Sequence, residues 1–240
     1  MLYCLMKSLS KTALMVYAIC PRIQAGKKAI FGSVHFQKSL ELFEKLQDNT
    51  KRIAAESGLE TFWIFDHKQQ GRSFGEKYSN AFEDLFKQGY GQIISIGNDI
   101  PGLSASHILQ AQRELLNSPS VLGPAEDGGN YLIALSATTF DKASFANLPW
   151  NSEGLHQALK SLLQYRQGRN VQVAQLEYLI DIDDFSSFNK YKKHLKSGDF
   201  YRFVMRLLLS INTFAKEQKQ FFEDLIISKD NPLRAPPTLL

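Results

Sequence analysis

Short apolar runs alternate with helical patterns along most of this chain, and this alternation limits the possible folds more than any other feature. Runs with the length and side chains of buried strands cover residues 13–19, 61–65, 92–96, 120–122, 131–135 and 171–179. Helices are predicted over residues 38–57, 74–88, 105–116 and 185–196, and after Ser152. Strands and helices in alternation predict an α/β fold of three layers, α/β/α, around a mixed, mostly parallel sheet.

The chain beyond residue 198 has a different pattern. Residues 200–227 carry one long apolar stripe at helical spacing, and a Pro-rich tail follows from residue 231. We therefore predict one domain over residues 1–198 and a C-terminal helical extension and tail over residues 199–240. The stripe would suit packing on the core, a homodimer or a membrane surface. We expect no transmembrane segment, because no stretch is long and apolar enough.

The charge balance bears on the partners. The 28 basic and 24 acidic side chains give a net charge of +4, and Lys and Arg form no run or stripe. This balance suits an anionic small molecule and argues against nucleic acid as a partner. Cys4 and Cys20 form no CxxC pair and no zinc spacing, which is typical of a reducing, cytoplasmic location.

Three polar motifs follow predicted strands. In GNDIPGL, Gly97 ends a strand and brings Asn98 and Asp99 to the edge of the sheet, where the Asp99 carboxylate offers the hard oxygen that Mg²⁺ or Mn²⁺ prefers. In GPAEDGGN, either Glu126 or Asp127 could act as a general base on an acceptor hydroxyl. Both motifs are also ordinary turn sequences, and Asp-Gly is a common hairpin signal.

The third motif, DIDD, places Asp181, Asp183 and Asp184 between a strand and a helix. Crowded carboxylates repel one another, and a bound cation relieves that repulsion. Alternatively, one of them caps the helix that follows. All three motifs should meet at one edge of the sheet, because ligands of such folds bind at the carboxyl ends of parallel strands. A divalent cation there would suit a diphosphate.

Residues 69–195 resemble a bacterial family with the A-type glycosyltransferase fold, whose members are provisionally labelled nucleotide-diphospho-sugar transferases. Some members carry an arsenosugar-biosynthesis label. The motifs that carry the resemblance, in family order, are QQGRSFGEKYSNAF, IISIGNDIPGL, VLGPAEDGGNYLIAL, LPWNS and DIDDFSSF.

The resemblance implies roles for individual residues. It marks Asp99 and Asp183 as ligands of Mg²⁺ or Mn²⁺, and Asp127 as part of the acceptor-side loop. The remaining acceptor-side residues that it implies are Gly128, Gly129, Asn130 and Trp150. The residues that it places near the nucleotide of the donor are Gly71, Gly75, Glu76 and Lys77. Gly97 and Asn98, next to Asp99, are further candidates for donor binding.

The chain also departs from the family pattern. Its first loop, CPRIQAGKKAIFG, keeps Lys27 and Lys28 as candidate phosphate contacts but lacks the usual Arg. Asn98 leaves no Asp-x-Asp pair around Asp99, and Asn130 replaces a common aromatic residue.

Three functions fit these observations. The leading hypothesis is a metal-dependent glycosyltransferase that takes a nucleotide-diphospho-sugar donor and a small-molecule acceptor. A nucleotidyltransferase acting on a phosphorylated small molecule is the second, and it would release pyrophosphate. A non-catalytic sugar-nucleotide-binding protein is the third, because function resides in the site rather than in the fold.

Overall fold

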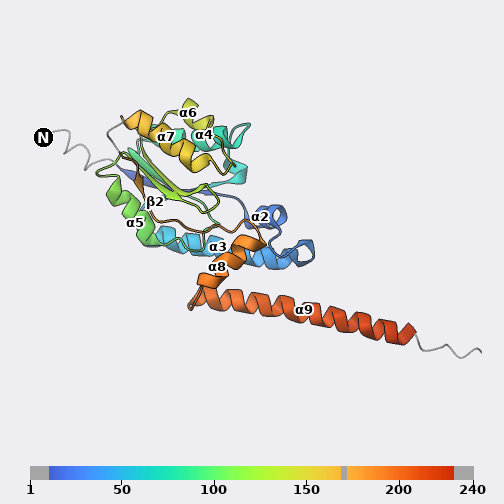
Figure 1. Ribbon diagram of the computed structural model, residues 1–240. Coiled ribbons are helices and arrows are strands. Elements are labelled where there is room, and N and C mark those ends of the chain that lie inside the picture. Colours follow the sequence, from blue (N-terminus) through green and yellow to red (C-terminus); the bar gives the residue numbers. More distant parts are fainter. Residues whose placement is uncertain (1–10, 169–171, 230–240) are drawn as a thin grey trace, which may run out of the picture. The chain divides into compact units, whose positions relative to one another are not determined.

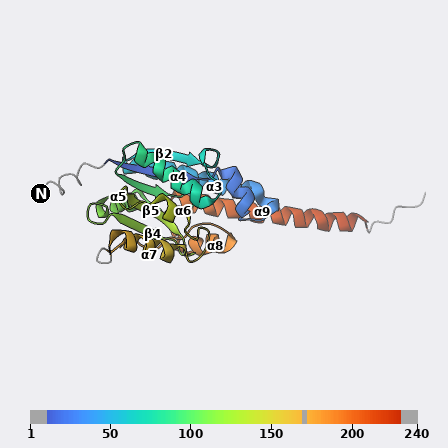
Figure 2. The same ribbon diagram turned by 90° about the horizontal axis from the view of Figure 1, so that it is seen from above.

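The structure is a computed structural model that describes residues 11–168 and 172–229 of the chain. The chain divides into two compact units, the first ending at Tyr191 and the second beginning at Lys192. The domain boundary expected at residue 198 remains a prediction. Figures 1 and 2 show the elements in two views.

A six-stranded sheet forms the centre of the first unit, in the order β2-β1-β3-β5-β4-β6. Its strands are β1 (Thr12–Ala18), β2 (Glu60–Phe65), β3 (Gln92–Ile96), β4 (Ser120–Pro124), β5 (Asn130–Ser136) and β6 (Ala174–Gln175). β5 runs antiparallel to both of its neighbours, while β1 pairs in parallel with β2 and β3, and β4 pairs in parallel with β6. Five strands therefore point the same way, and their carboxyl ends share one edge.

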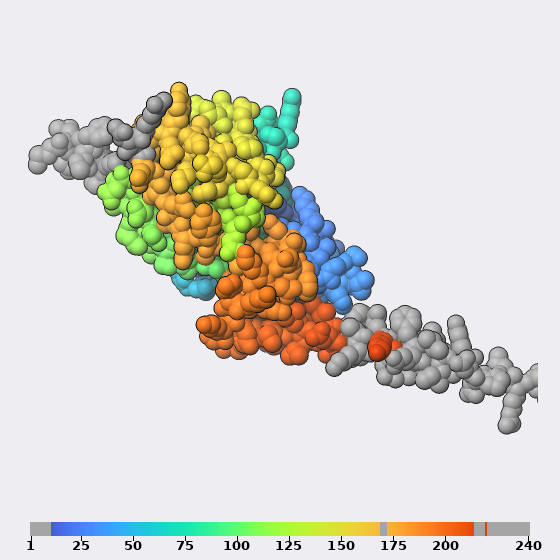
Figure 3. Space-filling view, viewed as in Figure 1, coloured from blue at the N-terminus to red at the C-terminus, as the bar shows by residue number. Residues whose placement is uncertain are grey.

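Helices cover both faces of this sheet (Figure 1). The α-helices of the first unit are α2 (Pro21–Lys28), α3 (Phe36–Ser57), α4 (Phe74–Lys87), α5 (Ala105–Glu114), α6 (Lys142–Ala146), α7 (Leu155–Gln167) and α8 (Phe185–His194), the last of which crosses the boundary at Tyr191. Two short 3-10 helices are η1 (Ser33–His35) and η2 (Asp66–Lys68). Figure 3 shows the face on which α6 and α7 are exposed, in yellow to light orange.

Strand alternation divides the interior into two hydrophobic cores. Leu14 and Val16 of β1 pack in one core with residues of α3 and α5 such as Ile53 and Ile108. Met15, on the other face of β1, packs in the second core with residues of α4, α6 and α7. A strand with apolar residues at every position thus has both faces buried. The predicted three-layer α/β fold with a mostly parallel sheet is confirmed.

Two of the predicted elements were wrong in detail. The strand expected over residues 171–179 contains only the two residues of β6, and position 171 lies outside the described residues. Ser152 does not cap α7, because its hydroxyl donates to the Pro149 carbonyl at 2.7 Å and the helix begins at Leu155.

The structure also has a helix where the sequence suggested a loop. This helix is α2, which starts at Pro21. Proline favours the first turn of a helix because its φ is already helical.

The second unit contains one long helix, α9 (Asp199–Lys229). None of the helices in the described ranges combines the length and apolar character that crossing a membrane requires. A homodimer through this helix remains a prediction.

Replacing Phe82 should show how much the second core stabilises the first unit. The Phe82 side chain is fully buried and its ring contacts Tyr78, Phe140 and Phe145. Phe82→Ala leaves a cavity, so we expect the free energy of unfolding to fall by about 3–5 kcal/mol in urea titrations. Tyr165 is an aromatic side chain on α7 that is 81% exposed, and Tyr165→Ala should change it by less than about 0.5 kcal/mol. Equal losses in both variants would contradict this assignment of the core.

Candidate functional site

The segments that follow the parallel strands line a cavity of about 760 Å³. Ile19 follows β1, Asp66 follows β2 and Asp99 follows β3, while Asp127 lies in the turn between β4 and β5. Asp181 comes from the segment after β6. The cavity therefore lies at the carboxyl edge of the sheet, where α/β folds of this kind bind their ligands.

The segment 179–182 brings the DIDD carboxylates over this cavity. Its first residue, Leu179, forms a parallel bridge with Ala125 and donates its N–H to the Pro124 carbonyl at 3.2 Å. Three residues later, Ile182 donates its N–H to the carbonyl of Asp99 at 3.2 Å. The backbone thus crosses from the end of β4 to the loop after β3, and it carries Asp181 and Asp183 with it.

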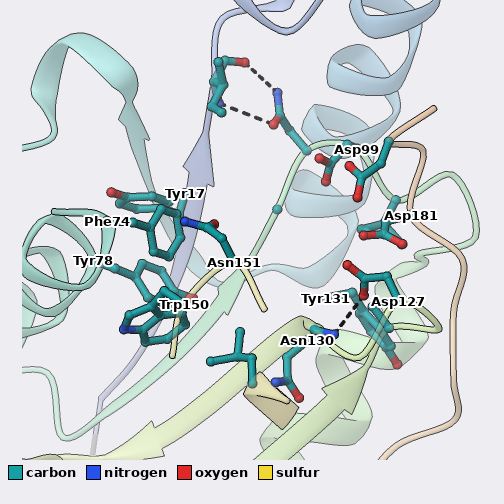
Figure 4. A pocket seen from close by; sticks show the side chains of 18 of the residues that line it. Tyr17, Phe74, Tyr78, Asp99, Asp127, Asn130, Tyr131, Trp150, Asn151 and Asp181 are labelled. Carbon is teal, nitrogen blue, oxygen red and sulfur yellow. Dashed lines mark hydrogen bonds between the residues drawn. The ribbon is translucent and has the colours of Figure 1, made fainter. Parts of the chain in front are cut away.

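Several carboxylates lie close together at one end of the cavity (Figure 4). Asp127, Asp181 and Asp183 each offer an oxygen within 4.8 Å of the other two. Burial, together with the negative charges of Asp183, Asp127 and Asp99, raises the pKa of Asp181 from 3.8 to about 7. Such a cluster of oxygen donors suits a hard divalent cation.

Lys28 bridges two of the carboxylates. Its Nζ lies 2.7 Å from Oδ2 of Asp99 and 2.5 Å from Oδ1 of Asp183, and it donates to the Ile182 carbonyl at 3.1 Å. Burial by itself lowers the pKa of Lys28, but the charges of Asp99 and Asp183 outweigh burial and hold the pKa above its ordinary value. The ammonium therefore stands where a cation shared by these carboxylates would bind.

Asn98 braces the sheet edge. Its Nδ2 donates to the Ile19 carbonyl at 3.0 Å, its Oδ1 accepts from the Ile19 N–H at 3.4 Å, and only 2% of the residue is exposed. The amide thus ties the end of β3 to the end of β1. An aspartate could not donate the first of these bonds, which is a physical reason for the asparagine at position 98.

The DGG sequence is both a hairpin turn and part of the cavity. Asp127 accepts the Gly129 N–H at 2.8 Å, which orients its carboxylate within the turn. Gly128 has a φ of +92°, and a Cβ there would lie 2.1 Å from the carbonyl oxygen of Glu153. Only glycine permits this conformation and this close approach. The turn is thereby packed against the 151–153 loop, which also lines the cavity.

Aromatic rings form the opposite wall of the cavity (Figure 4). The Trp150 ring lies 5.3 Å from Phe74 and 5.2 Å from Tyr78, and Tyr17 lies 4.7 Å from Tyr78. A Cβ on Gly75 would lie 2.6 Å from the Trp150 ring, so this glycine makes room for the wall. The cavity thus has an acidic end and an aromatic side.

The structure brings most of the expected site residues to this cavity. Those that line it are Lys27, Lys77, Gly97, Asn98, Asp99, Asp127, Gly129, Asn130, Trp150 and Asp183. Five expected residues lie outside the lining, namely Gly71, Gly75, Glu76, Glu126 and Gly128. Lys28 is not part of the lining either, but it contacts the Asp99 carboxylate of the cavity. Glu76 accepts the Arg72 N–H at 2.7 Å at the start of α4, and Glu126 pairs with Lys190. Asp184 accepts the Ser187 N–H at 2.7 Å, so this member of DIDD caps α8.

Sequence reasoning missed several lining residues. Tyr17 and Asp66 occupy the last position but one of β1 and the first position after β2, so their place at strand ends was an available signal. Gln24 carried no such signal, because residues 21–28 were not recognised as a helix. Its Nε2 donates to Oδ2 of Asp99 at 3.3 Å.

Comparisons with known proteins agree with this fold. Residues 45–152 match the sequence model of a family described as an uncharacterized protein conserved in bacteria, DUF2064. A protein from Desulfovibrio desulfuricans G20, provisionally named a nucleotide-diphospho-sugar transferase, has a TM-score of 0.73 at 20% identity, over 87% of this chain and 98% of that one. The resemblance predicted from the sequence is confirmed, and at this identity it establishes the fold.

More distant structures also match. An Rv0371c homologue from Mycobacterium sp. strain JC1 has a TM-score of 0.43 at 13% identity, over 75% of this chain and 94% of that one. Rv0371c of Mycobacterium tuberculosis H37Rv in complex with manganese has a TM-score of 0.39 at 11% identity, over 75% and 97%. No curated protein matches the chain.

The brace made by Asn98 leads to a test on stability. Asn98→Asp removes the donor to the Ile19 carbonyl and places a buried negative charge beside that oxygen. We expect the free energy of unfolding to fall by about 1–3 kcal/mol at pH 7. The same change at the exposed Asn212 serves as the control and should be close to neutral. If Asn98→Asp proves as stable as the wild type, the brace is not a stabilising element.

The raised pKa of Asp181 predicts a pH dependence of stability without metal. In the folded protein the Asp181 carboxyl keeps its proton up to about pH 7, whereas in the unfolded chain it loses the proton near pH 3.8. The contribution of Asp181 to the free energy of unfolding therefore falls as pH rises between these two values. In EDTA, Asp181→Asn should be more stable than the wild type by about 1–3 kcal/mol at pH 8, with partial screening by solvent taken into account. The difference should shrink toward pH 5. Asp48→Asn, an exposed control on α3, should show no such trend.

Proposed function

We propose that this protein is a metal-dependent glycosyltransferase that moves a sugar from a nucleotide-diphospho-sugar donor to a small-molecule acceptor. One observation carries the proposal: Asp99, Asp127, Asp181 and Asp183 line one end of a cavity at the carboxyl edge of the sheet. A volume of about 760 Å³ suits a ligand larger than a simple metabolite. The structural likeness to the Desulfovibrio protein that is provisionally named a nucleotide-diphospho-sugar transferase supports the fold on which such a site would be built.

The donor set fits Mg²⁺ or Mn²⁺. All of the candidate ligands are carboxylate oxygens, which hard divalent cations prefer to nitrogen or sulfur. Asp183 belongs to both groupings: it lies within 4.8 Å of Asp127 and Asp181, and it shares the Lys28 ammonium with Asp99. We assign the metal to Asp99, Asp181 and Asp183. When bound there, a divalent cation would supply the charge that holds a diphosphate and stabilises it as a leaving group.

Positive side chains nearby suit the phosphates of the donor. Lys27 and Lys77 both line the cavity, from α2 and α4 respectively. Lysine ammonium groups bind phosphate as point charges and need no fixed fork geometry. These two lysines could therefore provide the phosphate contacts that relatives obtain from an Arg in the first loop.

Asp127 is the better candidate for the general base. It is exposed, it lines the cavity, and the Gly129 N–H holds one of its oxygens in place. Glu126, the alternative from the sequence, is paired with Lys190 and lies outside the lining. In the proposed reaction the Asp127 carboxylate takes the proton of the acceptor hydroxyl, and that oxygen attacks the anomeric carbon as its bond to the diphosphate breaks.

The aromatic side of the cavity would position the rings of the ligands. Phe74, Tyr78 and Trp150 offer flat apolar surfaces, against which a sugar or a nucleobase can pack. The Trp150 indole is itself fixed, because its Nε1 donates to the Phe145 carbonyl at 2.9 Å. A rigid wall opposite the carboxylates would help to orient the anomeric carbon toward the acceptor.

Nucleotidyl transfer is the alternative on this fold. Related nucleotidyltransferases normally carry a glycine-rich first loop, whereas here Cys20 precedes a helix that starts at Pro21. This observation favours glycosyl transfer. The two reactions differ in their products, because nucleotidyl transfer releases pyrophosphate and glycosyl transfer releases a nucleoside diphosphate.

A ligand panel with two matched variants tests the proposal. Thermal midpoints would be measured with nucleoside di- and triphosphates and sugar nucleotides, with and without Mn²⁺, and positive donors would be assayed for release of nucleoside diphosphate. We expect a Mn²⁺-dependent rise in the midpoint with a sugar nucleotide. Asp99→Asn should lose this rise and at least about 100-fold of the turnover. Asp127→Asn should keep the rise and lose turnover to a similar degree.

The remaining outcomes separate the alternatives. A response to a triphosphate alone, with release of pyrophosphate, would move the assignment to nucleotidyl transfer. Binding of sugar nucleotides with no turnover, including toward water and simple sugars, would favour the non-catalytic binder. A panel with no response at millimolar ligand would overturn the site.

A further inference from the structure

We propose that Lys28 couples metal binding to nucleotide binding: it holds the carboxylates Asp99 and Asp183 and releases them when a diphosphate arrives. This inference rests on the proposed function and assigns Lys28 a role beyond phosphate contact. It makes Lys28 a positioning residue that acts through the two carboxylates.

Each N–H group of the Lys28 ammonium has an acceptor within the protein. Its three N–H groups face three acceptors, which are Oδ2 of Asp99 at 2.7 Å, Oδ1 of Asp183 at 2.5 Å and the Ile182 carbonyl at 3.1 Å. The Lys28 side chain is only 18% exposed. Charge-assisted hydrogen bonds at a mostly buried site are stronger than the same bonds on a solvent-exposed surface.

A metal ion cannot share this position with the ammonium. A cation held by Asp99 and Asp183 would draw on the same two carboxylates that Lys28 Nζ contacts. The two positive charges would then stand within a few ångströms of each other and repel. A free metal ion must therefore break the bonds to Lys28 before it gains its own, and its affinity for the site without nucleotide is reduced accordingly.

A diphosphate removes this obstacle. Its oxygens would offer new acceptors to the Lys28 ammonium, and Asp99 and Asp183 would then be free to hold the metal. Asp99 does not lose all of its protein donors in the exchange, because Gln24 Nε2 also donates to its Oδ2, at 3.3 Å. Gln24 Oε1 is buried and has no hydrogen-bond partner among the described residues, so a polar atom beside Asp99 is left unsatisfied by the protein.

Coupling of this kind is reciprocal. If a nucleoside diphosphate raises the affinity for Mn²⁺ by some factor, Mn²⁺ must raise the affinity for the nucleotide by the same factor. Lys28 would therefore favour binding of the metal and the nucleotide together. If Lys28 forms only a structural ion pair, its removal lowers stability and leaves this factor unchanged.

Titrations of Mn²⁺ into the full chain test the inference. Binding would be followed by calorimetry or by the electron paramagnetic resonance of free Mn²⁺. Each titration would be made without nucleotide and again with UDP, GDP, ADP or CDP. Lys28→Met should bind Mn²⁺ at least tenfold more tightly than the wild type without nucleotide. The coupling factor should fall at least fivefold in this variant. Lys28→Arg, which keeps the charge, should retain the weak metal binding of the wild type.

Lys27→Met is the matched control, because it removes the same charge one residue away. Lys27 lines the cavity but has no ion pair with Asp99 or Asp183 in the described structure. It should change the affinity for Mn²⁺ alone by less than threefold. If Lys28→Met does not fold, as judged by circular dichroism, Lys28→Gln replaces it, since this side chain is neutral and can still donate to a carboxylate.

The outcomes separate failure of this inference from failure of the proposed function. A folded, neutral Lys28 variant with the Mn²⁺ affinity and coupling factor of the wild type overturns the coupling role. If Asp99→Asn then abolishes Mn²⁺ binding, the proposed metal site still stands. If no variant binds Mn²⁺ with or without a nucleotide, both the metal site and the role of Lys28 are wrong.

Discussion

Repulsion among carboxylates is the constraint on which the rest of this site depends. Asp99, Asp127, Asp181 and Asp183 come from three separate loops, yet all line one end of a single cavity. Like charges at such distances raise the free energy of the folded state unless protons or cations compensate them. The protein shows both kinds of compensation, since Lys28 bridges two of the carboxylates and the pKa of Asp181 is raised to about 7. A site held in this condition is disposed to bind a cation.

The surrounding structure keeps these groups in place without filling the cavity. The Asn98 amide ties the ends of β1 and β3 together, and the 179–182 segment joins the end of β4 to the loop after β3. Gly128 lets the hairpin turn approach the 151–153 loop. Each of these contacts fixes backbone beside the cavity, so the rigidity of the sheet extends to the loops that carry the acidic side chains. Preorganisation of this kind is what binding and catalysis of a charged substrate require.

Much of the fold could be predicted from the sequence, because the periodicity of apolar residues reflects burial directly. β3 was predicted with its observed bounds, and β1, β2, α3 and α4 within two residues. The errors have physical causes. Residues 174–179 lie beside β4 but form a regular ladder only at Ala174 and Gln175 and a single bridge at Leu179, and after Leu179 the chain leaves β4 to reach Asp99. α2 is short and polar and contains Gly26, so it shows no apolar stripe, and the proline at its start was the remaining signal.

The sequence by itself determined the layers of the fold, the strand ends at which chemistry could occur, and the acidic motifs found there. These follow from local rules, namely the periods of strands and helices and the turn residues between them. Only the tertiary structure decided which acidic groups meet and which of them serve the backbone instead, as Asp184 does at the start of α8. It also decided that Lys28 joins Asp99 and Asp183. The contact of Lys28 with Asp99 spans 71 positions of the chain, and its bond to the Ile182 carbonyl beside Asp183 spans 154. Both depend on strand order and on the path of the segment that follows β6. The spacing of residues along the sequence does not predict which residues this far apart in the chain come into contact.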